Sequence, residues 1–175
     1  MGLVKPLRVL GLWLVIPAGA IVQLQTVAMM LHNYKAVGAM RDQLQRSGLA
    51  QVTSLRGIPQ SCRDEGFLDG ISYTYVVDVA KIPDAYWASK DAWQRHWHHA
   101  PFGDSQSESF DRLVEYNKRE WGCPELPALK SPRFVVTVLY SEAGYLGPRT
   151  VSSKGEGFMA YDTRTSRLYW VYSGN

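Results

Sequence analysis

The sequence predicts an α+β protein. A single N-terminal transmembrane helix precedes a small domain with an antiparallel sheet of about four to five strands and two helices on one face. Three observations support this prediction. Residues 9–31 are apolar and hold no charged side chain, several later segments alternate in polarity as half-buried strands do, and two amphipathic segments lie between those strands. The chain therefore divides into one anchor and one globular domain.

The apolar run of residues 9–31 would reach roughly 35 Å as a helix, more than the hydrocarbon thickness of a bilayer, which is about 30 Å. The basic start with Lys5 and Arg8 is typical of a secretory signal, but the apolar run is longer than such signals need. We therefore expect an uncleaved signal-anchor whose residues 9–31 contact the lipid bilayer. Cleavage after the small-residue sequence Ala18-Gly19-Ala20 is the alternative.

The location of the domain is predicted from its two cysteines. Basic residues flank both ends of the apolar run, so the positive-inside rule does not decide the orientation. Cys62 and Cys123 lie in polar surroundings and form no C-x-x-C pair, which favours a disulfide between them over a metal or redox motif. The sequence therefore predicts a single-pass protein of the inner (cytoplasmic) membrane with its C-terminal domain in the periplasm.

One stripe of the anchor is less apolar than the rest. Small and polar residues follow each other there at helical spacing, as in membrane helices that pack against a partner helix. These residues are Gly19, Gln23, Thr26 and Met30. We expect them to contact a transmembrane partner, although Gln23 could instead only reach the membrane interface.

The chain has four predicted parts. They are a short basic tail (residues 1–8), the transmembrane helix (9–31), a helical stalk (32–48) and an extracytoplasmic α+β domain (49–175). Val37, Met40 and Leu44 recur at helical spacing in the stalk and form a narrow apolar seam. Such a seam either docks on its own domain or pairs with another chain.

The domain is predicted to contain strands at residues 51–55, 71–79, 134–140 and 149–152, and a final hairpin of residues 157–161 and 168–172. The predicted helices are residues 85–98 and 108–121, and residues 57–62 form a loop. Residues 134–140 are apolar on both sides except for Thr137, which is typical of a central strand.

The hairpin sequence YDTRTSRLYW, from Tyr161 to Trp170, is similar to a single strand-turn-strand unit of quinoprotein-type propellers. The sequence holds only one such unit, and one unit cannot close a propeller. The resemblance therefore implies a hairpin and no more.

Three histidines, His96, His98 and His99, are the strongest candidates for chemistry. If the helix of residues 85–98 persists, His96 and His99 are three positions apart and could share a copper or zinc ion. The competing interpretation is a solvated helix end whose imidazoles favour the C-terminal dipole. We expect no cofactor, with copper or zinc as the alternative.

Three tryptophans, Trp87, Trp93 and Trp97, lie in or beside the same helical segment. They either pack the helix on the sheet or contact a protein partner, because Trp is enriched in binding hot spots. Periodicity does not separate these two roles.

The charge balance and the motifs favour a binding role. The formal net charge is +3, from 19 basic and 16 acidic residues, and no basic run indicates nucleic-acid binding. No nucleophile elbow or phosphate loop indicates an enzyme. We expect an accessory or assembly subunit of a cell-envelope membrane protein complex, acting through protein contacts of its anchor and domain, with homo-oligomers allowed. The alternatives are a periplasmic metal-binding or small catalytic domain centred on the three histidines, and a membrane-anchored immunity-type inhibitor.

Overall fold

The computed structural model describes residues 5–66, 70–100, 110–115, 122–139 and 155–174. Within these ranges, the side chains of residues 5–22, 63–66, 70–71, 138–139 and 155–156 are not described. The chain forms two compact units, Met1–Lys35 and Ala36–Asn175. The second unit contains the sheet and both hydrophobic cores.

The first element is α1 (Lys5–Arg46), a continuous helix that includes the apolar run of the sequence. Across the part of the chain that the structure describes, no helix combines the length and the apolar character that a membrane crossing requires. The structure therefore does not support the predicted transmembrane helix.

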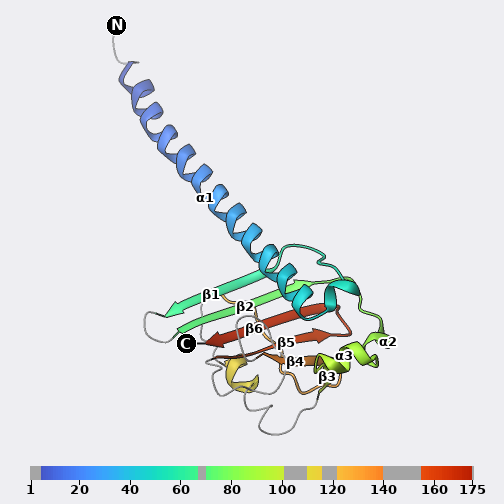
Figure 1. The fold of residues 1–175 in the computed structure, drawn as a ribbon. Coiled ribbons are helices and arrows are strands. Elements are labelled where there is room, and N and C mark those ends of the chain that lie inside the picture. Colours follow the sequence, from blue (N-terminus) through green and yellow to red (C-terminus); the bar gives the residue numbers. More distant parts are fainter. Residues whose placement is uncertain (1–4, 67–69, 101–109, 116–121, 140–154, 175) are drawn as a thin grey trace. The chain divides into compact units, whose positions relative to one another are not determined.

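The domain is built on a six-stranded antiparallel sheet with the order β1-β2-β6-β5-β4-β3 (Figure 1). The strands are β1 (Gln60–Gly66), β2 (Gly70–Asp78), β3 (His98–His99), β4 (Phe134–Leu139), β5 (Gly155–Asp162) and β6 (Arg167–Gly174). The α+β class and the antiparallel pairing confirm the sequence prediction, but the number of strands exceeds the predicted four to five.

Four strands follow the alternation in the sequence. β2, β4 and the β5–β6 hairpin lie where strands were predicted. The predicted strand at residues 149–152 lies outside the described residues. The predicted strand at residues 51–55 is wrong, because the chain forms a 3₁₀ turn η1 (Leu49–Gln51) there and only Leu55 bridges to Val79.

The two edge strands were missed because neither has an apolar alternation. β1 has the sequence QSCRDEG and pairs with β2 over its whole length, from Gln60 opposite Val76 to Gly66 opposite Gly70. β3 consists of two histidines opposite Val136 and Val135 of β4. Both segments are strands because they pair with a neighbouring strand, β2 or β4, and not because of a pattern in their own sequence.

The sheet buries side chains on both faces. The first face, here the α1 face, presents mainly aromatic and long aliphatic side chains: Tyr73, Val77, Val135, Met159, Tyr161, Leu168, Trp170 and Tyr172. The second, here the disulfide face, presents these buried side chains: Val76, Phe134, Val136, Phe158, Ala160, Tyr169 and Val171. β4 contributes to both faces, as its sequence predicts.

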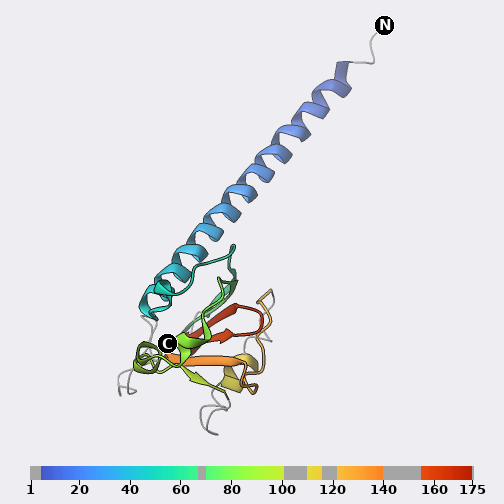
Figure 2. The ribbon, with the colours of Figure 1, turned by 90° about the vertical axis from the view of Figure 1, so that its right-hand side faces the viewer.

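Each face has its own cover. Met40 and Leu44 of α1 and Leu49 of η1 pack on the α1 face, together with α2 (Asp84–Trp87) and α3 (Lys90–Gln94). A helical segment, residues 110–115, covers the disulfide face with the following loop, through Phe110, Leu113, Val114, Leu126 and Leu129. The last turns of α1 and residues 110–115 lie on opposite sides of the sheet (Figure 2). The prediction of helices on one face was therefore wrong.

The predicted helix of residues 85–98 is two short helices. α2 ends at Trp87 and α3 begins at Lys90, because the Ser89 hydroxyl accepts a hydrogen bond of 3.2 Å from the Ala92 amide and so caps a new helix. Of the predicted helix at residues 108–121, residues 110–115 are helical and the rest lies outside the described residues.

Candidate interaction surfaces

The last three turns of α1 dock on the domain. Ala36, Met40, Gln43 and Leu44 recur at helical spacing and are buried, with Met40 at 0% exposure. Met40 and Leu44 belong to the same core as the α1 face of the sheet. The apolar seam of the predicted stalk is thus docked on its own domain at these two residues.

The end of α1 is held by Gly48 and Arg95. Gly48 has a left-handed backbone (φ 75°) and directly follows Ser47, whose amide hydrogen-bonds the Gln43 carbonyl. A Cβ at Gly48 would overlap the Arg95 guanidinium. Arg95 Nη1 donates a hydrogen bond of 2.9 Å to the Arg46 carbonyl, one of the carbonyls that a helix end leaves unpaired.

The sheet in turn fixes the backbone of Arg95. The Thr137 hydroxyl on β4 donates a hydrogen bond of 3.0 Å to the Arg95 carbonyl. Thr137 is itself buried, so this hydrogen bond is shielded from water. Thr137, Arg95 and Arg46 therefore form one hydrogen-bonded path from β4 through the end of α3 to the end of α1, and we call Gly48, Arg95 and Thr137 the α1 latch.

The three candidate tryptophans separate clearly. Trp87 and Trp97 are buried, and their ring centroids lie 5.4 Å apart in the core. Trp93 is 70% exposed on α3. Packing is therefore the role of Trp87 and Trp97, and neither can be a surface contact in this fold. Trp93 remains the candidate for a protein contact.

The α1 face contains polar atoms that lack hydrogen bonds. Four buried groups find no hydrogen-bond partner among the described residues: Tyr86 Oη, Trp87 Nε1, Trp97 Nε1 and Trp170 Nε1. Burial raises the pKa of the Tyr86 phenol, while the charge of Arg95 lowers it and that of Asp91 raises it. These four side chains are therefore held by packing, whereas the Tyr161 hydroxyl of the same core accepts a hydrogen bond of 3.1 Å from the Ile82 amide and donates one of 3.3 Å to the Ser166 hydroxyl.

The three histidines do not share a helix face. α3 ends at Gln94, His96 has a left-handed backbone (φ 54°), and His98 and His99 form β3. All three are exposed, and His99 Nδ1 lies 3.1 Å from the Pro132 carbonyl oxygen. The helical spacing assumed for a metal pair is therefore wrong. Within the described part of the chain, no three His, Cys, Asp or Glu side chains are placed to hold a metal ion.

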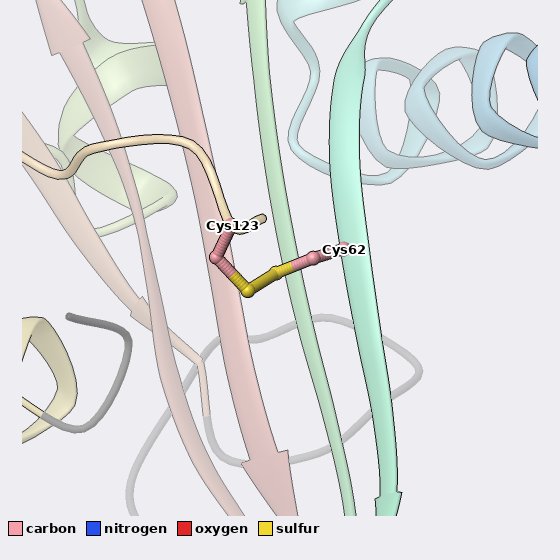
Figure 3. Close-up of a disulfide and its surroundings, with 2 residues drawn as sticks. All are labelled: Cys62 and Cys123. Atoms are coloured by element: carbon pink, nitrogen blue, oxygen red, sulfur yellow. A yellow bond between two sulfur atoms is a disulfide. The ribbon is translucent and has the colours of Figure 1, made fainter. Parts of the chain in front are cut away.

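Cys62 and Cys123 form a disulfide, as predicted (Figure 3). Cys62 lies on β1 opposite Thr74, which is opposite Val171 of the disulfide face. Residues directly opposite in an antiparallel sheet point to the same side, so the bond lies on this face. It ties the loop that carries Leu126 and Leu129 to the edge strand.

Tyr169 lies on the disulfide face near the end of the hairpin. Burial raises the pKa of its phenol. Arg167 and Arg133 lower that pKa and Asp162 raises it, but burial is the largest effect. The neutral phenol is therefore the form that the folded domain favours.

The predicted contact residues of the anchor lie on α1. Gln23, Thr26 and Met30 are exposed, and the side chain of Gly19 is outside the described residues. The neighbouring apolar side chains are exposed as well: Leu24, Val27, Met29, Met30 and Leu31. These exposed side chains point in several directions around the helix, because their positions do not repeat at one helical spacing.

Comparisons with known proteins add no family. A scan against protein-family models, a search of curated proteins and a search of solved structures find no match to this chain. The interpretation of these surfaces therefore depends on the residues themselves.

Sequence analysis missed the α1 latch. The predicted stalk ends at residue 48, but nothing near Gly48 in the sequence indicates that Arg95 would contact it. Thr137 gives no such signal either, because Gly48, Arg95 and Thr137 are far apart in the chain. The pairing of β3 with β4, in which His98 lies opposite Val136, brings Arg95 close to Thr137.

Proposed function

We propose that this chain is a membrane-anchored accessory or assembly subunit of a cell-envelope membrane protein complex. In this proposal, residues 9–31 anchor it in the inner membrane, and the domain lies in the periplasm and contacts protein partners. The single observation that carries the proposal is the exposed apolar surface of α1, where Leu24 is 69% exposed and Leu31 is 57% exposed.

That surface is unfavourable in water. Exposed apolar area costs about 25 cal/mol per Å², and a helix that is apolar on all sides is stable when hydrocarbon or protein surrounds it. The apolar run begins before the described side chains, at residue 9, and no charged residue interrupts it. The anchor is thus proposed from the sequence together with the exposure of residues 23–31.

Two features of the domain support the rest of the proposal. The Cys62–Cys123 disulfide favours an oxidising compartment such as the periplasm. Trp93 offers a large exposed ring on α3, and exposed Trp residues are frequent hot spots of protein interfaces. We therefore propose Trp93 as a contact with the partner.

The experiment is recovery of the complex from membranes. The tagged whole chain is extracted in mild detergent and purified, and we expect a membrane protein to accompany it in a fixed ratio. Trp93→Ala should lower that ratio, whereas Ile58→Ala, at another exposed apolar side chain of the domain, should not. A chain that is released from membranes by carbonate, or that purifies alone, would contradict the proposal.

A further inference from the structure

Basic side chains gather at one end of the sheet, where β2 and β5 end and β4 and β6 begin. Arg164 lies in the turn between β5 and β6, Arg167 opens β6, and Arg133 directly precedes β4. Two further bases reach this end on segments that contact the end of β2 and β5. The exposed bases of this end, here the hairpin-end bases, are Arg56, Lys81, Arg133, Arg164 and Arg167.

Backbone hydrogen bonds place Arg56 and Lys81 in this group. The Arg56 amide donates a hydrogen bond of 2.8 Å to the carbonyl of Asp78, the last residue of β2. Ile82, which follows Lys81, donates one of 3.1 Å from its amide to the Tyr161 hydroxyl on β5. Both bases therefore stand on backbone that the end of the sheet holds in place.

The acids that close β2 and β5, Asp78 and Asp162, are already engaged. Asp78 Oδ1 lies 2.8 Å from Arg167 Nε, and Asp162 Oδ2 lies 3.6 Å from Arg133 Nε. The Asp162 side chain is 3% exposed and also accepts a hydrogen bond of 2.9 Å from the Arg164 amide. These carboxylates therefore do not neutralise the remaining side chains of the group.

Three of the hairpin-end bases have no acidic partner. Arg56, Lys81 and Arg164 form no ion pair with any residue that the structure describes. Asp84, three positions after Lys81 at the start of α2, forms none either. With Asp84 counted, five bases meet three acids, a net charge of +2 (5 − 3), and one of these acids is buried. Such a surface attracts an anionic partner and repels a cationic one.

The turn between β5 and β6 is fixed from several sides. The Ser166 amide donates a hydrogen bond of 2.9 Å to the Asp162 carbonyl, and the Ser166 carbonyl accepts one of 2.9 Å from the Val79 amide. The Thr163 amide donates one of 3.0 Å to the Arg133 carbonyl. Ser166 also has a left-handed backbone (φ 55°), which is uncommon for a residue other than glycine. Charges on a fixed backbone lose less entropy on binding than charges on a loose loop.

The place of this end in the domain favours a protein over the bilayer as the partner. The buried part of α1 begins at Ala36, and the helix ends at Arg46, about 15 Å further along its axis. The basic end is contacted by the chain that follows Arg46, since the Ala80 amide donates a hydrogen bond of 2.8 Å to the Ser54 carbonyl. α1 also ends on the side of the domain where β2 ends and β6 begins (Figure 1). In an anchored chain the lipid would lie on the Ala36 side, and about 15 Å exceeds the Debye length of about 8 Å.

We propose that the hairpin-end bases bind an acidic segment, rich in Asp and Glu, of a partner protein in the periplasm. The choice of protein over lipid rests on the proposed function, because it uses the direction in which the anchor leaves the domain. The attraction for carboxylates rests on the charges of the domain alone. The inference thus names the chemistry of a partner that the proposed subunit would contact.

Binding of a polyglutamate peptide to the whole chain in detergent tests the proposal, with fluorescence anisotropy of the labelled peptide as the measurement. Arg56→Gln with Arg164→Gln should raise the dissociation constant about three- to tenfold, as expected for two exposed ion pairs. Lys35→Gln with Arg41→Gln removes the same charge at exposed positions of α1 and should change the constant less than twofold. Equal changes in the two double variants, or no binding to the wild-type chain at low ionic strength, would overturn the proposal.

A fluorophore at the turn separates protein from lipid. Both native cysteines are in a disulfide, so Thr165→Cys gives one free thiol at an exposed position for an environment-sensitive dye. In nanodiscs of phosphatidylcholine, polyglutamate should shift the emission of the dye. A shift on changing to phosphatidylglycerol nanodiscs without peptide would assign the surface to lipid and overturn the proposal. Carbonate extraction and recovery of the complex report the proposed function separately, so its failure is distinguishable from a failure of peptide binding.

Discussion

The two faces of the sheet retain their covers in different ways. On the disulfide face, a covalent bond ties the covering loop to β1, and the core is made largely of Val, Leu and Phe side chains. On the α1 face, the cover is α1, α2 and α3, held by packing and by the hydrogen bonds of the α1 latch. The difference indicates that the first cover is permanent in an oxidising compartment, and the second depends on non-covalent contacts alone.

The largest expected effect is the loss of the disulfide. Cys62→Ser with Cys123→Ser should lower the free energy of unfolding by about 4 kcal/mol, because the bond closes a loop with a sequence separation of 61. Denaturant unfolding followed by Trp fluorescence measures the change. Reduction of the wild-type chain is the control and should give the same midpoint. If oxidised and reduced chains unfold at the same denaturant concentration, the disulfide does not stabilise the cover of the disulfide face, and the contrast with the α1 face is wrong.

The next effect concerns the α1 latch. Gly48→Ala should lower the free energy of unfolding by about 1–2 kcal/mol for the left-handed backbone, and by more because the new Cβ displaces Arg95. Gly38→Ala is the matched control, and its helical backbone and open surroundings predict a gain of up to about 1 kcal/mol. If both substitutions change the free energy of unfolding in the same direction, the left-handed backbone and the contact with Arg95 do not make Gly48 a required glycine.

A smaller effect is expected from the guanidinium itself. Arg95→Met keeps most of the side-chain volume but loses the hydrogen bond to the Arg46 carbonyl, which should cost about 1 kcal/mol. The double variant Gly48→Ala with Arg95→Met should lose less stability than the two single variants lose together, because Gly48→Ala already displaces Arg95. If the two losses of stability are strictly additive, Arg95 and the end of α1 are not energetically coupled, which would contradict the proposed role of the α1 latch.

The smallest effect is a pH dependence of the disulfide face. Burial raises the pKa of Tyr169, so the stabilisation from its neutral phenol is complete below about pH 10 and is lost as the pH rises toward the folded-state pKa. Tyr169→Phe should therefore flatten the fall in the free energy of unfolding above about pH 10. An identical alkaline slope in wild type and Tyr169→Phe would refute this assignment.

Much of the sheet could be predicted because its central strands contain their own signal. The alternation of residues 71–79 and the paired apolar runs of the hairpin specify β2, β5 and β6 without help from the rest of the chain. β4 is apolar on both sides, and this observation also implied two covered faces. That implication was not drawn at the sequence level, which explains why the covering helices were placed on one face.

The candidate surfaces were harder to predict because they depend on long-range contacts. Trp87, Trp93 and Trp97 have similar sequence neighbourhoods, and only the break at Ser89 and the end of α3 decide which rings turn inward. The contact between Gly48 and Arg95 requires three elements to assemble first. The disulfide was predictable because the chain has only two cysteines and both lie outside apolar periodic runs.

The position of β6 has a consequence for biosynthesis. β6 follows all the other described strands in the chain, yet it lies between β2 and β5 and joins the two halves of the sheet. Until residues 167–174 have left the ribosome, β1–β2 and β3–β4–β5 each expose an unpaired strand edge, and neither core can close. A nascent chain at this stage is a natural client for a chaperone, and a stop in translation shortly before Arg167 would leave two aggregation-prone fragments of sheet.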